Sequence, residues 1–212
     1  MRFDDRRHAG VLLGRAVAAL APLDPVVYGL PRGGVPVAYE VARALGCPLD
    51  VVIVRKVGVP YQPELAMGAI AEGGVTTRNE EILSLTGIDE ALFEEVAARQ
   101  RVEIEKRVAA YRGDTRPLPP EGHTAIVVDD GLATGSTAIA AVSVLEQLRA
   151  RSVWLAVPVA PASPVPGLDG RVERMVVLSR PRGFGAVGSW YRDFTQTTDD
   201  EVRELLESSR LP

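Results

Sequence analysis

One stretch of the chain, residues 125–137, constrains the fold more than any other. It reads Ala-Ile-Val-Val, then Asp129 and Asp130, then Gly-Leu-Ala-Thr-Gly-Ser-Thr. The apolar run predicts a buried strand, and the loop after the carboxylates opens a helix predicted over 136–149. Ligands of open α/β sheets bind at the carboxyl ends of the strands, and a helix N-terminus offers free N–H groups there. The stretch therefore predicts two carboxylates beside an anion-binding loop.

Short apolar runs alternate with amphipathic stretches along the rest of the chain. With the strand already described, at 124–129, strands are predicted over 26–30, 49–54, 153–159 and 172–178, and further helices over 9–20, 35–45, 88–112 and 198–208. Residues 57–65 are expected to form a loop, and 66–77 a hairpin that turns at Gly73-Gly74. This order predicts an α/β fold with a mostly parallel sheet flanked by helices. We expect one domain over 1–212, with 88–112 as a helical insertion.

Composition and charge exclude several classes of protein. The 24 Lys and Arg against 28 Asp and Glu give a formal net charge of −4, which argues against a nucleic-acid or membrane-surface binder. No apolar run is long enough to span a bilayer, and the first residues are too charged for a signal peptide, so we expect a cytoplasmic protein. Cys47 is the only cysteine, so we expect neither an internal disulfide nor a cysteine-based zinc site.

The loop after the acidic pair has the chemistry of a phosphate site. Gly135 lets a ligand approach the backbone closely, and Thr134, Ser136 and Thr137 add hydroxyl donors. Two adjacent carboxylates beside such a loop suit a diol, such as the hydroxyls of a ribose. The combination indicates a ribose 5-phosphate site. The alternative is that the two aspartates cap the following helix and bind nothing.

Residues 126–137 resemble the ribose-phosphate signature of the type I phosphoribosyltransferases, and the resemblance covers most of residues 24–180. It implies a five-stranded parallel sheet with a small hood over the site, and phosphoribosyl pyrophosphate (PRPP) as the donor. Asp129 and Asp130 would contact the ribose hydroxyls, and Ala133, Thr134, Gly135, Ser136 and Thr137 the 5′-phosphate. Mg²⁺ would be coordinated by PRPP oxygens and would contact the two aspartates only through water.

Two other segments match the family by position. Arg32, Gly33 and Gly34 follow the first strand, where the resemblance places the pyrophosphate loop, and we expect a cis peptide between Arg32 and Gly33. Arg55 and Lys56 end the second strand and are expected in the same pyrophosphate site, where Lys56 would contact the diphosphate. With the two aspartates, Arg32 and Lys56 form the expected catalytic set. The alternatives are an ordinary glycine turn and a solvated strand end.

The lid and the base site are expected from weaker patterns. Residues 57–72 fit the family's mobile loop, with Tyr61, Gln62 and Glu64 as contacts. The hood is expected within 180–212, where Phe184, Trp190, Tyr191 and Phe194 would stack on the base. These rings could instead fill a core gap or a dimer contact. Ala133 stands where 6-oxopurine enzymes usually carry an Asp, so the adenine, orotate and uracil branches stay open.

The resemblance implies a PRPP-dependent glycosyltransferase of nucleotide metabolism, active as a homodimer. It would transfer ribose 5-phosphate to a nucleobase or related nitrogen acceptor and release pyrophosphate. The alternative is a non-catalytic module of the same fold that senses PRPP or a nucleotide. A phosphatase with an Asp at a strand end would carry an Asp-x-Asp pattern, which Asp129-Asp130-Gly131 does not fit.

Overall fold

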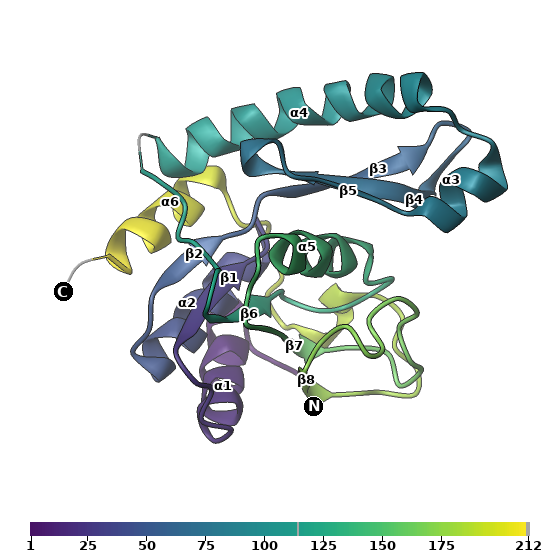
Figure 1. The fold of residues 1–212 in the computed structure, drawn as a ribbon. Coiled ribbons are helices and arrows are strands. Elements are labelled where there is room, and N and C mark those ends of the chain that lie inside the picture. The colour runs from purple at the N-terminus through teal and green to yellow at the C-terminus, as the bar shows by residue number, and fades with distance from the viewer. Residues whose placement is uncertain (114, 211–212) are drawn as a thin grey trace.

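A five-stranded parallel sheet forms the centre of the computed structural model, which describes residues 1–113 and 115–210 (Figure 1). The strand order is β2-β1-β6-β7-β8. The strands are β1 (Pro25–Gly29), β2 (Leu49–Val51), β6 (Thr124–Val128), β7 (Ser152–Val159) and β8 (Arg174–Ser179). Valine-rich runs suit this sheet because helices cover parallel strands on both faces. The predicted fold class is confirmed.

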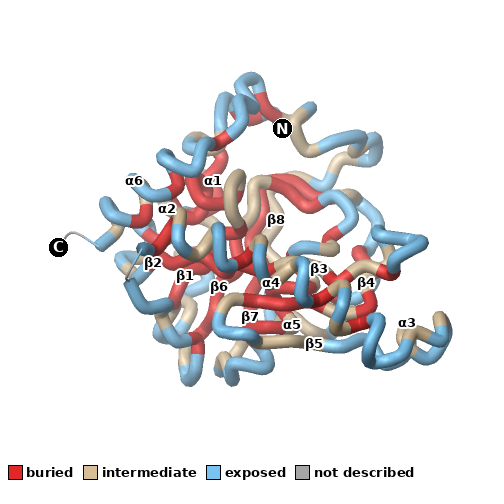
Figure 2. The backbone as a smooth tube through the Cα atoms, turned by 90° about the horizontal axis from the view of Figure 1, so that it is seen from above, coloured by how far each residue is buried: buried red, intermediate tan, exposed pale blue. Residues whose placement is uncertain are grey.

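Alternate residues along each strand face opposite layers of the core. Val27 and Ile126 share one cluster with residues of α1 (Arg6–Ala18), α2 (Gly34–Leu45) and α6 (Asp199–Ser208). Val26 and Val127 share the other cluster with residues of α5 (Ser136–Gln147). The two clusters follow from the period of two in a strand. The buried backbone in Figure 2 is concentrated in these central strands.

A second, smaller sheet with two helices forms a small lobe, residues 54–112 (Figure 1). Its strands, β3 (Val54–Val59), β4 (Gln62–Ala71) and β5 (Thr76–Arg78), are antiparallel in the order β3-β4-β5. Its helices are α3 (Glu80–Thr86) and α4 (Glu90–Arg112). Asp89 caps the start of helix α4, because its carboxylate accepts a hydrogen bond from Leu92 N at 2.9 Å. Phe93, Ala97, Ile104 and Tyr111 form its buried stripe.

The prediction of a loop over 57–65 is wrong, because β3 and β4 form a hairpin that turns at Pro60 and Tyr61. Val57 and Val59 are fully buried in the core, so this segment carries a strand's pattern that its prolines obscure. Pro63 is tolerated because the register shifts on either side of Gly58, as at a β-bulge. The expected turn at Gly73-Gly74 is present between β4 and β5.

The small lobe is joined to the parallel sheet by a buried arginine. Arg112, at the end of α4, is 6% exposed and forms an ion pair with Asp50, which is 1% exposed. Its Nε donates to Glu72 Oε2 at 2.8 Å, and its Nη2 donates to Val51 O at 2.6 Å. One guanidinium thus satisfies partners from β2 and from the small lobe.

The C-terminal stretch 184–195, part of the region 180–212 in which the hood is expected, packs on the N-terminal segment. Phe3 N donates to Trp190 O, and Arg192 N donates to Phe3 O, both at 2.8 Å. Phe3 and Tyr191 share a cluster with Ala9 and Val159. The stretch is therefore part of the large lobe, beside Asp130, and the division of the chain into domain and hood stays a prediction.

Within residues 1–113 and 115–210, no helix combines the length and the apolar character that crossing a membrane requires.

Candidate functional site

The acidic pair and the glycine loop meet at the carboxyl edge of the parallel sheet. β1 and β6 are neighbours, and Gly29 pairs with Val128, so the loops after both strands emerge side by side. A Cβ on Gly34 would lie 2.6 Å from Val128 O and 2.9 Å from Asp129 Cα. A Cβ on Gly33 would collide with the Asp130 carboxylate. Glycine is required at position 34 because the two loops approach backbone to backbone there.

The cis peptide lies one residue earlier than expected. It joins Pro31 to Arg32, whereas Arg32–Gly33 was the predicted position. Gly33 is already the N-cap of α2, with helical angles of φ −61° and ψ −30°. The turn from strand to helix is therefore complete before Gly33.

The two carboxylates share a site that disfavours their both being ionised. Burial, and then the charge of Asp130, raise the pKa of Asp129 well above its usual range. Burial also raises the pKa of Asp130, while the Arg6 guanidinium opposes that rise. Asp129 Oδ1 accepts from Asp130 N at 2.9 Å. Hydrogen-bond donors or cations placed beside such a pair would favour its charged form.

Arg6 is a site residue that the sequence reasoning missed. Its Nε donates to Asp130 Oδ2 at 2.8 Å, and its Nη1 donates to Thr195 O at 2.7 Å. The guanidinium also lies 3.9 Å from the centroid of the Phe194 ring. No local pattern marks this arginine, since its carboxylate partner lies 124 residues further along the chain.

Residues 133–137, here called the anion loop, open helix α5 as the sequence predicts, and their binding of an anion stays a prediction. Gly135 caps α5 with φ 78°, a left-handed conformation that favours glycine. Thr134 Oγ1 lies 3.1 Å from Ser136 Oγ, and this contact is open to solvent. The first N–H groups of a helix have no partner within the helix, so this loop presents free donors beside its hydroxyls.

A cavity of about 710 Å³ separates this loop from the small lobe. Thr134, Ser136 and Thr137 line it from the large lobe, together with Pro31. The small lobe contributes residues of β3, the β3–β4 hairpin and α4: Val54, Arg55, Lys56, Gly58, Val59, Pro60, Pro63, Glu64, Val96, Arg99, Gln100 and Arg107. The structure thus brings Arg55, Lys56 and Glu64 to one cavity with the anion loop.

Residues expected on a mobile loop lie on the β3–β4 hairpin. Lys56 Nζ and Glu64 Oε2 form an ion pair at 2.8 Å, with Glu64 82% exposed. Tyr61, at the turn, is 70% exposed and its Oη donates to Thr86 O at 3.5 Å. Gln62 is exposed at the start of β4. Of these residues, Lys56 and Glu64 form the pair that borders the cavity.

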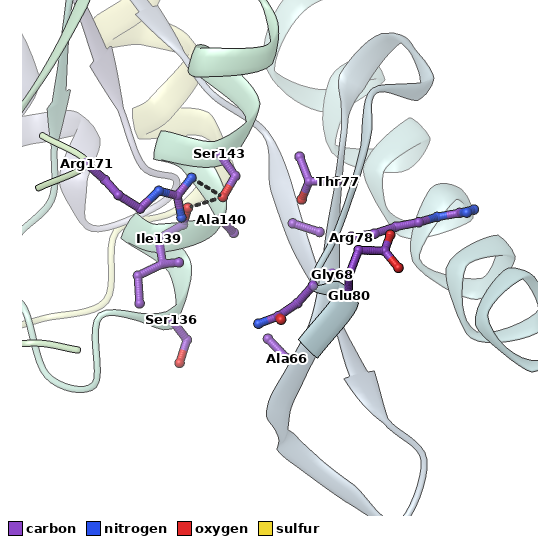
Figure 3. Close-up of a pocket in the computed structure, with 12 residues that line it drawn as sticks. Ala66, Gly68, Thr77, Arg78, Glu80, Ser136, Ile139, Ala140, Ser143 and Arg171 are labelled. Carbon is purple, nitrogen blue, oxygen red and sulfur yellow. Dashed lines mark hydrogen bonds between the residues drawn. The ribbon is translucent and has the colours of Figure 1, made fainter. Parts of the chain in front are cut away.

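A second cavity, of about 400 Å³, lies between α5 and the strands β4 and β5 (Figure 3). Ser136, Ser143 and Arg171 lie on one side of it, and Thr77 and Glu80 on the other. Arg171 Nη2 donates to Ser143 Oγ at 2.9 Å. Ser136 lines both cavities, so the two flank the start of α5.

The aromatic cluster corrects one expected base contact. Tyr191 is 2% exposed, its ring centroid lies 5.4 Å from that of Phe3, and its Oη donates to the Asp130 carbonyl oxygen at 2.5 Å. The ring packs in the core and leaves no open face for a base. Trp190 Nε1 donates to Phe184 O at 2.8 Å, and Phe194 carries Arg6 on its ring. Base stacking by these three stays a prediction.

The fold and this site define an α/β protein with a phosphate-type loop beside an acidic pair, and comparison with known proteins gives its family. The model of the phosphoribosyl transferase domain matches residues 22–176, so the chain belongs to the phosphoribosyl transferase domain family. The curated "Putative phosphoribosyl transferase Rv0571c" of Mycobacterium tuberculosis H37Rv is 47% identical over 205 residues. That alignment covers 97% of this chain but 46% of the relative, so the chain spans about half the relative's length.

Solved structures share the fold of this chain. TT1426 from Thermus thermophilus is 48% identical with a TM-score of 0.92, covering 98% of this chain and 99% of that one. A hypothetical protein from Neisseria gonorrhoeae with bound ppGpp is 13% identical with a TM-score of 0.52, covering 99% of both chains. That second likeness shows the fold alone. The resemblance found in residues 126–137 is confirmed at the level of the family.

Proposed function

We propose that this protein transfers ribose 5-phosphate from PRPP to a nucleobase-like nitrogen acceptor and releases pyrophosphate. The observation that carries the proposal is the meeting of two loops at one sheet edge. There Gly34 contacts Asp129 backbone to backbone, and the Thr134–Thr137 loop opens toward a basic cavity. A phosphate, a diol and a diphosphate could each be met there by groups of suitable chemistry.

The donor's 5′-phosphate is assigned to the start of α5. Free N–H groups and the positive end of the helix dipole favour a dianion there, and the hydroxyls of Thr134 and Thr137 add donors. The ribose hydroxyls are assigned to Asp129 and Asp130. Hydrogen bonds from two hydroxyls would stabilise the charged form of carboxylates whose pKa values burial has raised.

The reaction breaks the C1–O bond, and its electron pair leaves on the diphosphate. The lone pair of the acceptor nitrogen forms the new C1–N bond, and the nitrogen's proton passes to solvent. Positive charge grows on the ribose and negative charge on the leaving group. The carboxylates of Asp129 and Asp130 favour the first, and the cations of Arg32 and Lys56 favour the second. No covalent enzyme intermediate is needed.

Mg²⁺ is the proposed cofactor, and the donor set fits it. Among the described residues, no group of three or more His, Cys, Asp and Glu side chains could hold a metal ion. Mg²⁺ commonly binds one or two carboxylates while keeping waters and substrate phosphates. Asp129 and Asp130 would hold it through water, and the bound ion would neutralise charge on the diphosphate.

The acceptor is proposed to approach from the side of Phe184, Trp190 and Phe194. A homodimer in the cytoplasm is part of the same proposal. The alternative, a PRPP or nucleotide sensor of the same fold, would keep the donor site and lack turnover.

Pyrophosphate release from PRPP and Mg²⁺ with adenine, orotate, uracil, hypoxanthine and guanine tests the proposal. We expect release with at least one base. Thr137→Val should weaken PRPP binding about tenfold or more, since a hydrogen bond to a charged group is worth about 1.5–3 kcal/mol. Thr86→Val, on α3, is the matched control. PRPP binding without release for any base would support the sensor, and absence of PRPP binding would refute both.

A further inference from the structure

One face of α4 reaches the cavity described above, although the family resemblance gives this helix no part in the site. Val96, Arg99, Gln100 and Arg107 line the cavity. Their spacing of three, one and seven residues places them on one side of a helix. They lie across the cavity from Thr134 and Thr137. Figure 1 shows α4 running along the outer side of the small sheet.

Positive charge is concentrated on the small-lobe side of the cavity, which we call the wall. Arg55, Lys56, Arg99 and Arg107 all line the cavity. Lys56 pairs with the 82% exposed Glu64, and Arg99 pairs with the 59% exposed Glu95. Exposed pairs of this kind are weak, so an anionic ligand can replace the carboxylates at little cost.

Arg107 stands out on the wall. Within residues 1–113 and 115–210, no carboxylate oxygen lies within 4.0 Å of its guanidinium. The same wall carries Arg55, whose Nε is buried and finds no hydrogen-bond partner in the described part of the chain. Its Nη2 lies 4.0 Å from Oε2 of Glu103, a side chain that is 44% exposed. Burial, and then the charge of Arg107, lower the pKa of Arg55. The Arg55–Glu103 pair is long and partly exposed and therefore weak, so an anion that binds both guanidinium groups can replace it.

Arg107 also lies close to the pyrophosphate loop. It precedes Tyr111 by one helical turn, and Tyr111 Oη donates to Asp199 Oδ1 at 2.7 Å. The same Asp199 oxygen lies 3.7 Å from Arg32 Nη1. Pro31, the residue before Arg32, lines the same cavity as Arg107, so this end of α4 and the start of the Arg32–Gly34 loop border one space.

We propose that Arg107 of α4 is a further contact for the leaving diphosphate of PRPP and extends the pyrophosphate site expected at Arg55 and Lys56. The inference rests on the proposed function and assigns α4 a direct part in it. Guanidinium groups suit the ligand because they bind phosphate oxygens in pairs. The helix would thus bind the part of the donor that departs, while the anion loop holds the part that is transferred.

Titration calorimetry with inorganic pyrophosphate and Mg²⁺ tests this contact. Arg107→Gln should weaken pyrophosphate binding by about ten- to a hundredfold, the usual effect of losing a charged hydrogen bond. Arg107→Lys, which keeps the charge, should recover part of the affinity. Arg101→Gln, on the same helix and outside the cavity lining, should change it by less than about threefold. Thermal unfolding of each variant verifies that it is folded.

The outcomes separate this inference from the proposed function. If the wild type binds PRPP and Arg107→Gln binds pyrophosphate as tightly as the wild type does, the Arg107 contact is refuted and the donor site stands. If Arg107→Gln does not fold, unchanged affinity in Arg107→Ala refutes the contact equally. If the wild type binds neither PRPP nor pyrophosphate, both are refuted.

Discussion

The carboxyl edge of the parallel sheet and the small lobe face the same cavity, but they are built by different contacts. At the sheet edge, the position of each loop is set by backbone against backbone, as Gly34 against Val128 and Asp129 shows. In the small lobe, the cavity wall carries long charged side chains whose partners are largely exposed, such as Lys56 with Glu64. The edge is suited to fixing one ligand geometry.

The small lobe, by contrast, is suited to adjusting to a ligand. Its exposed ion pairs contribute little to stability, so they can be exchanged for contacts with an anion. Its fixed point is Arg112, at the C-terminal end of α4. Changes at the sheet edge should therefore be costly, and changes on the wall should alter binding while the fold persists.

The largest effect is expected at the junction between the two regions. Arg112→Met leaves the buried Asp50 carboxylate without its guanidinium, which costs about 3–5 kcal/mol for a buried pair. Denaturant unfolding measures this loss. Arg203→Met, which removes the exposed pair with Asp200, is the control and should cost less than about 1 kcal/mol. Equal effects of the two substitutions would contradict the role of Arg112.

Gly34→Ala tests the backbone contact at the sheet edge. The added methyl would meet Val128 O and Asp129 Cα, which cannot rotate away, so we expect a loss of about 1–3 kcal/mol. PRPP affinity should fall as well, because the two loops must separate. Gly183→Ala is a suitable control, since a Cβ there has open space within 4 Å. A Gly34→Ala protein with wild-type stability and affinity would show that the loops are not held together.

Arg6→Gln tests the partner of Asp130. Removing the guanidinium should raise the pKa of Asp130 further, since Arg6 is the group that opposes the effect of burial. We expect a loss of about 1–2 kcal/mol in stability and a higher KM for PRPP, as for a partly buried charged hydrogen bond. Arg7→Gln, on the same helix with a 74% exposed side chain, provides the comparison. Identical KM values for the two variants would exclude a positioning role for Arg6.

Asp129→Asn should give the smallest change in stability, and the variant should be more stable than the wild type. The pKa of Asp129 is raised in the folded protein, so the native state binds the carboxyl proton more tightly than the unfolded chain does. Wild-type stability therefore falls as the pH rises from about 4 through that raised pKa. The neutral amide of the variant does not suffer this loss. Its Tm should exceed that of the wild type by a few degrees at neutral pH, where about 1 kcal/mol corresponds to roughly 2–4 °C.

The pH dependence of the difference in Tm between Asp129→Asn and the wild type tests this explanation. Near pH 4 the wild-type Asp129 is largely protonated in the native state, and the two Tm values should converge as the pH falls further. Asp193→Asn should behave oppositely, because hydrogen bonds from Thr195 lower the pKa of the exposed Asp193. An Asp129→Asn protein that is less stable than the wild type at neutral pH would contradict the account of the acidic pair.

The sequence predicted the parallel sheet and the anion loop because both are local patterns. Valine-rich runs specify buried strands, and residues 126–137 carry their strand, carboxylates and helix start in one segment. The pairing of Arg6 with Asp130 was not predictable, since it depends on the docking of α1. The hairpin at Pro60 was missed because a turn and a bulge carry the same proline and glycine signals as a loop.

The direction in which side chains point was the other feature that could not be predicted from the sequence. A polar helix such as α4 has charges on several faces, and the sequence alone does not show that Arg107 reaches the cavity while Arg101 does not. Aromatic residues are equally ambiguous, because Tyr191 and Trp190 are adjacent and only Tyr191 is buried. In both regions, the backbone pattern was predictable where the facing partner was not.

A crystal structure of the protein soaked with PRPP and Mg²⁺ tests the central claim most directly. The account predicts the 5′-phosphate against the N–H groups of residues 134–137, with the ribose hydroxyls on Asp129 and Asp130. The diphosphate should lie between the Arg32–Gly34 loop and the wall that carries Arg107. PRPP bound elsewhere, or a 5′-phosphate away from the start of α5 in a fully occupied site, would contradict it.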